Sequence, residues 1–89
     1  MTNRVKYTDT GTTTTTGFTP VYNVTYDGRP LGQVWKVSAK GPWAATAAAV
    51  RADGLRGEGP NRGRAVAAVL VKAYGLPWSV AFDAAGVKR

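Results

Sequence analysis

The small size of most apolar side chains is the feature that most limits what this chain can fold into. Alanine and valine dominate the apolar residues, and only three Trp, four Tyr and two Phe add bulk among 89 residues. A chain of this length buries only about 60% of the surface that its unfolded form exposes. There is no cysteine to form a disulfide, which fits a reducing compartment. We therefore expect one domain with a thin core, in which aromatic rings supply much of the burial and a homodimer would bury more.

The chain has twelve Lys or Arg residues and five Asp or Glu residues, which gives a formal net charge of +7 at pH 7. A surface this positive attracts polyanions. Histidine and cysteine are absent, so the chain lacks the groups for common zinc sites, a Cys nucleophile or a Ser-His pair. Its five acids fall in expected turns, loops and an exposed helix, where they form no general acid and base. The sequence favours a non-enzymatic binding protein with no catalytic residues, no cofactor and no metal.

The N-terminal residues 1–17 show no hydrophobic periodicity. Five consecutive threonines, Thr12 to Thr16, lie between Gly11 and Gly17. Little would offset the entropy lost on ordering such a run. Because threonine has high strand propensity, an edge strand is the alternative. We predict that residues 1–17 form a disordered Thr-rich arm and that residues 18–89 form the domain.

Alternating polarity begins after this arm. Apolar and polar residues alternate from Tyr22 to Tyr26, and Asp27-Gly28 then marks a turn, which predicts a β-hairpin over residues 20–40. Residues 43–50 are ambiguous, because their alanines favour a helix whereas two strands need a third to form a stable sheet. We choose a strand there. The Gly-rich residues 53–60 are expected to form a loop.

Two helices are expected in the C-terminal third. Asn61 is a good N-cap, an apolar stripe follows from Val66 to Ala73, and Gly75 suits the end of a helix. A shorter helix is expected from Pro77 to Ala85. The predicted fold is α+β: a three-stranded antiparallel sheet packed by one main helix, with a short C-terminal helix and the disordered arm.

The first candidate site is a basic stretch that leads into the main helix. Arginines beside a helix N-terminus form a seat for phosphate. The alternative is a solvated loop whose charges keep a small protein soluble, and both interpretations stay open. No Gly-Lys-Ser/Thr closes the stretch, so it is not a phosphate-binding loop of the nucleotide-hydrolysing kind. Its arginines are Arg51, Arg56, Arg62 and Arg64.

The second candidate site is the surface of the hairpin, where Arg29, Lys36 and Lys40 alternate with aromatic residues. Basic and aromatic residues together suit base stacking, or a strand face placed in a DNA groove. The competing interpretation, which we favour, places Trp35 and Trp43 in the core under the helix. Lys36 and Lys40 would then be ordinary solvated side chains.

The third candidate is the pair Trp78 and Phe82, which are spaced to share one face of the C-terminal helix. We expect this pair to close the end of the core. An exposed apolar patch that binds a partner or a second copy of the chain is the alternative.

Residues 21–75 follow an outline that two known groups of proteins share. The pattern runs Val21-Tyr22-Asn23-Val24, Asp27-Gly28, Gly32-x-Val34, Trp43-x-Ala45 and Arg62-x-x-Ala65-Val66-x-x-Val69-Leu70. It resembles small strand-strand-strand-helix proteins that are frequent in actinobacteria and their phages, most of which have no assigned activity. The order of elements is also similar to AP2-type domains and to the N-terminal DNA-binding domains of some phage integrases.

In those DNA-binding domains a three-stranded sheet enters the major groove and its Arg and Trp side chains make the contacts. This chain departs from them, because its expected third strand is nearly all alanine. A likeness of topology is also weak support for a shared function. Carried over, the resemblance implies contacts from Arg29, Trp35, Lys36, Lys40 and Trp43.

The sequence therefore predicts a non-enzymatic nucleic-acid-binding accessory or regulatory protein, encoded by a phage, that contacts the backbone of double-stranded DNA through Arg and Lys. The alternative is a small phage protein that inhibits or redirects an acidic host or defence protein. No apolar run approaches the length that crosses a bilayer, so we expect no membrane partner and a place in the cytoplasm, that of the host cell for a phage protein.

Overall fold

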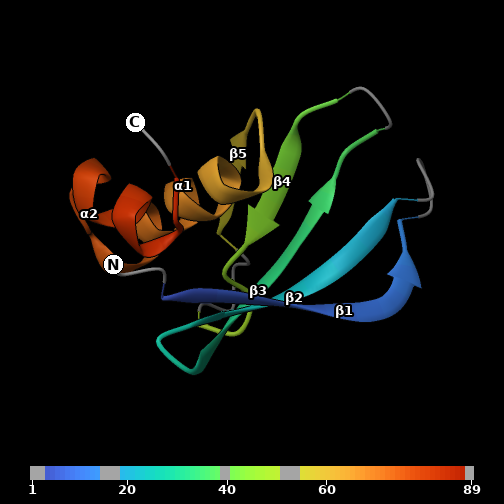
Figure 1. Cartoon of the computed structure of the whole chain (residues 1–89), viewed down its shortest axis with the longest axis horizontal. Coiled ribbons are helices and arrows are strands. Elements are labelled where there is room, and N and C mark those ends of the chain that lie inside the picture. Colours follow the sequence, from blue (N-terminus) through green and yellow to red (C-terminus); the bar gives the residue numbers. More distant parts are fainter. Residues whose placement is uncertain (1–3, 15–18, 39–40, 51–54, 88–89) are drawn as a thin grey trace.

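Each strand of the sheet pairs with the next strand along the chain, which gives a five-stranded antiparallel meander. The structure, a computed structural model, describes residues 4–14, 19–38, 41–50 and 55–87. Helices α1 (Arg62–Tyr74) and α2 (Trp78–Ala84) follow the last strand and lie on the same side of the sheet (Figure 1). The strands are β1 (Val5–Thr13), β2 (Pro20–Tyr26), β3 (Arg29–Lys36), β4 (Trp43–Thr46) and β5 (Arg56–Gly59).

The α+β class is confirmed, but the three-stranded sheet is wrong because strands β1 and β5 extend it on both sides. Strand β1 occupies residues 5–13 of the predicted disordered arm, so that prediction is wrong for this segment, and the strand pairs with β2 from Val5 opposite Tyr26 to Asp9 opposite Tyr22. Residues 1–3 and 15–17 of the predicted arm lie outside the described residues. Val5 is only 2% exposed. The backbone N–H of Arg4 donates to the carbonyl of Ala84 (2.8 Å), which ties the start of β1 to the end of α2. Val5 and Tyr7 alternate with polar residues and pack into the core ahead of the threonines. Their burial offsets the conformational entropy that the segment loses when it becomes ordered.

Strand β5 occupies residues 56–59 of the predicted Gly-rich loop, and its glycines have a packing role. Residues 53–54 of that loop lie outside the described residues. A Cβ atom added to Gly57 would lie 2.9 Å from the side chains of Ala68 and Val69, and one added to Gly59 would lie 2.9 Å from the backbone of Arg64 and Ala65. Helix α1 therefore approaches β5 more closely than any side chain on these positions allows. The glycines that predicted a loop are the residues that let the helix dock.

The central hairpin is confirmed. Strands β2 and β3 pair from Val21 opposite Trp35 to Tyr26 opposite Arg29. Asp27 (φ 57°) and Gly28 (φ 81°) both lie in the left-handed region that a two-residue hairpin turn requires. The strand predicted over residues 43–50 forms only at Trp43–Thr46, since Ala48 to Val50 form a turn.

Both predicted helices form. Asn61 caps α1 by accepting a hydrogen bond from the backbone N–H of Arg64 (2.9 Å), and Gly75 ends it with φ 67°. Residues Ala65 to Leu70 of α1 are all buried, because the helix packs on β5, β4 and α2, with a smaller contact to β3. Helix α2 begins after Pro77 and packs on α1 through Ala81 and Ala84.

The register of β3 corrects the prediction that both Trp35 and Trp43 lie beneath the helix. Val34 is fully buried on the side that faces α1, and Trp35 points to the opposite side. Trp43 lies on the helix side and packs against the edge of the core. We call the helix side of the sheet the inner face and the other side the outer face.

Within the part of the chain that the structure describes, neither helix is long and apolar enough to cross a membrane.

The close contact of β5 with α1 yields a stability prediction. Gly57→Ala should destabilise the protein by about 1–3 kcal/mol, because the new methyl group overpacks the contact with Ala68 and Val69. Equilibrium unfolding in urea measures this loss. Glu58→Ala, on the neighbouring outer-face position, is the matched control and should change little. Equal stability of the two variants would contradict the packing role of Gly57.

Candidate functional site

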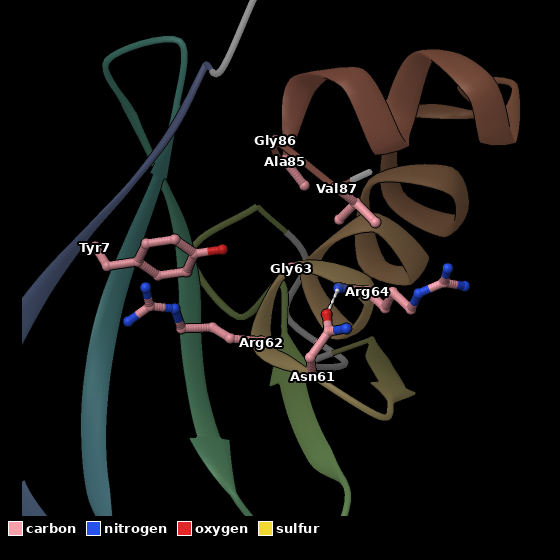
Figure 2. Close-up of a pocket in the computed structure, with 8 residues that line it drawn as sticks. All are labelled: Tyr7, Asn61, Arg62, Gly63, Arg64, Ala85, Gly86 and Val87. Atoms are coloured by element: carbon pink, nitrogen blue, oxygen red, sulfur yellow. Dashed lines mark hydrogen bonds between the residues drawn. The ribbon is translucent and has the colours of Figure 1, made fainter. Parts of the chain in front are cut away.

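The first turn of α1 places Arg62 above the inner face. Its guanidinium carbon lies 3.9 Å from the centre of the Tyr7 ring and 5.3 Å from the centre of the Tyr22 ring. These are cation–π distances, and they hold the cation between strands β1 and β2. In Figure 2 the Arg62 side chain extends from the helix start toward the Tyr7 ring. The arginine therefore bridges the helix and the edge of the sheet.

Tyr7 directs its hydroxyl group away from the Arg62 guanidinium, as Figure 2 shows. The hydroxyl oxygen is buried and has no hydrogen-bond partner among the described residues. Burial raises the pKa of the Tyr7 phenol above its ordinary value of 10.0, and the positive charge of Arg62 opposes part of this rise. Since the guanidinium lies against the face of the ring, it does not satisfy the oxygen.

Tyr7, Tyr22 and Trp43 form what we call the aromatic row, on the inner face. The Tyr22 and Trp43 rings are stacked, with centroids 6.4 Å apart and an angle of 29° between their planes. Lys36 is opposite Trp43 in the pairing of β3 with β4, so its side chain leaves the same face. All three rings are half-buried. Strands β1, β2 and β3 extend beyond both helices in Figure 1, so the helices cover only part of this face.

Arg64 lies in the same helical turn as Arg62. Its guanidinium carbon is 5.3 Å from the centre of the Phe82 ring. Neither Arg62 nor Arg64 forms an ion pair with a carboxylate of the described residues, and the first turn of α1 contains no acid. The positive end of the helix dipole adds to these two charges. The start of α1 is therefore a local concentration of positive potential.

Two other arginines are paired with carboxylates. Arg4 forms an ion pair with Asp27 at the hairpin turn. The hydrogen bond from Arg4 lowers the pKa of the Asp27 carboxyl, and the charges of Arg4 and Arg29 lower it further. Arg56 pairs with Glu58 (2.8 Å) on the outer face, with its guanidinium carbon 5.8 Å from the centre of the Trp35 ring.

The structure divides the predicted basic stretch. Arg62 and Arg64 lie together, but Arg56 lies near the other end of α1, where its carbonyl accepts a hydrogen bond from Lys72 (2.9 Å). The antiparallel packing of β5 against α1 causes this separation. Arg51 lies outside the described residues.

The predicted hairpin surface is divided as well. Lys36 and Trp43 share the inner face, whereas Trp35 lies on the outer face and Arg29 lies exposed at the hairpin turn. Lys40 lies outside the described residues. Tyr7 and Tyr22 were not among the predicted site residues. The alternation around Tyr22 placed it on a strand face, but no local signal showed that Arg62 would meet it.

Trp78 and Phe82 contact each other as their spacing predicted, with ring centroids 5.5 Å apart. Phe82 packs against the core, but Trp78 remains 53% exposed and Val80 43% exposed. Core closure is therefore confirmed for Phe82 and wrong for Trp78.

The site offers cations and aromatic surfaces rather than acid and base groups. No cluster of three or more side chains that could hold a metal ion occurs within residues 4–14, 19–38, 41–50 and 55–87. Comparison with known proteins adds no constraint, since no family model, no curated protein and no solved structure matches this chain.

The unpartnered hydroxyl of Tyr7 yields a second stability prediction. Tyr7→Phe should raise the free energy of unfolding at neutral pH by up to about 1 kcal/mol, because it removes a buried polar atom without a hydrogen bond. The raised pKa also makes the wild type lose stability as the pH rises above 10.0, since the unfolded phenol then releases its proton and the folded one retains it. Urea unfolding at neutral and alkaline pH measures both effects. A destabilised variant, or one with the same alkaline loss as the wild type, would refute this interpretation.

Proposed function

We propose that this chain is a non-enzymatic nucleic-acid-binding accessory protein that holds the phosphate backbone with Arg62, Arg64 and Lys36. The observation that carries the proposal is the unequal pairing of its arginines. Arg4 and Arg56 have carboxylate partners, whereas Arg62 and Arg64 form no ion pair with a described carboxylate. An arginine held by rings rather than by an acid keeps its donors and its charge for an anion.

The position of these two arginines supports the same conclusion. Cations in the first turn of a helix are unfavourable with the helix dipole by a few tenths of a kcal/mol, roughly. Departures of this kind from local preference occur at functional sites. With a formal net charge of +7, the protein would release counterions from a polyphosphate on binding.

A protein partner is the second candidate, favoured by the exposure of Trp78 (53%) and Val80 (43%) on α2. Under this alternative Trp78 anchors an acidic partner protein, and Trp78→Ala abolishes its function. Under the nucleic-acid proposal the same variant keeps its affinity for nucleic acid. Duplex DNA as the preferred form, a phage origin and a homodimer all remain predictions from the sequence.

The proposal predicts a steep dependence of affinity on salt. Arg62→Ala with Arg64→Ala should weaken binding about equally for all sequences and reduce the slope of log affinity against log salt by about 2. Fluorescence anisotropy with labelled random-sequence DNA at several salt concentrations measures both quantities.

The matched control is Arg4→Ala with Arg56→Ala, which removes the same formal charge from positions already paired with carboxylates. This control should keep most of the wild-type affinity and slope. Binding that ignores salt, or equal losses in the two double variants, would contradict the proposal.

A further inference from the structure

We infer that the aromatic row is a stacking surface for unpaired bases, so that this protein binds single-stranded in preference to double-stranded nucleic acid. This inference rests on the proposed function, names the form of its ligand and departs from the sequence-based prediction of duplex DNA. In the complex, a base stacks on the Tyr22 and Trp43 rings, and the adjoining phosphates contact Arg62 and Lys36. Stacking of this kind is independent of sequence, because every base has a π-face.

The register of the sheet places the Tyr22 and Trp43 rings side by side on the inner face. Tyr22 and Trp43 lie nearly parallel, at 29°, so a planar group can continue the stack that they begin. Trp43 is opposite Lys36 on one side and opposite Gly59 on the other. Gly59 has no side chain, and the first turn of α1 lies directly against it. Trp43 therefore lies between Lys36 and the helix turn that carries Arg62 and Arg64.

The preference for a single strand follows from the ring faces that the aromatic row offers to a ligand. In a duplex the base faces are stacked on one another, so only phosphates and groove edges could meet this surface. An unpaired strand offers its base faces as well as its phosphates.

Among the described residues, Asp9 is an acid that borders the aromatic row. Asp9 is opposite Tyr22 in the pairing of β1 with β2, and one of its carboxylate oxygens accepts a hydrogen bond from the backbone N–H of Gly11 (2.8 Å). Its charge repels phosphate on this side, which favours a path for the backbone along Arg62 and Lys36. Asp9→Asn keeps an acceptor for Gly11 and removes the charge, so this variant should bind the single strand more tightly than the wild type.

Trp43 and Trp35 provide a matched pair for the main test, because both are half-buried tryptophans on neighbouring strands with opposite faces. Anisotropy titrations compare a labelled oligothymidine with a duplex of equal length. Trp43→Ala should weaken binding of the oligothymidine by roughly 5- to 150-fold and change duplex binding little. Trp35→Ala should bind both as the wild type does. Equal behaviour of the two variants would overturn the inference.

A second measurement keeps Trp43 in place, so its result does not depend on whether the Trp43→Ala variant folds. In the chain carrying Trp35→Phe and Trp78→Phe, Trp43 is the remaining tryptophan, and saturation with unlabelled oligothymidine should quench its fluorescence. Unchanged fluorescence at saturation would overturn the inference. If duplex binding depends on Arg62 and Arg64 but Trp43 has no role, the stacking inference fails and the proposed function stands. Failure to bind either form would overturn the proposed function as well.

Discussion

The close approach of helix α1 to strand β5 is the contact on which the rest of the structure depends. Gly57 and Gly59 leave no side chain between the strand and the helix, and Ala45 on the neighbouring strand is almost fully buried beneath it. A core of alanine and valine can be well packed only if its layers lie this close. The short distance between α1 and β5 lets the small alanine and valine side chains fill the space between the layers.

This contact also determines where the charges lie. Because α1 packs closely on β4 and β5, its first turn lies beside Trp43. From this turn, the Arg62 side chain extends to the rings of Tyr7 and Tyr22. On the inner face, Tyr7, Tyr22 and Trp43 pack against the core, and the guanidinium group of Arg62 lies over the Tyr7 ring. The same side chains thus complete the core and form the candidate site.

The division of the arginines into two classes is a property of the folded chain. Arg4 meets Asp27 because β1 joins the sheet beside the hairpin, and Arg56 meets Glu58 because alternate residues of a strand share a face. Arg62 and Arg64 form no ion pair with a described carboxylate and lie against the rings of Tyr7 and Phe82. The net charge alone does not distinguish these classes, which separate arginines paired with a carboxylate from arginines that lie against aromatic rings.

Local signals in the sequence determined the central hairpin and both helices. Asp27-Gly28, Asn61 and Gly75 act through their own backbone conformations and immediate hydrogen bonds, so their neighbours in the chain are enough to predict them. The tertiary structure decided the two outer strands, the inward side of β3 and the assembly of the aromatic row. A strand at the edge of a sheet is stabilised by its partner strand and by the core beneath it, both distant in sequence. Val5 and Gly57 show their roles only once Ala84, Ala68 and Val69 lie against the segments that contain them.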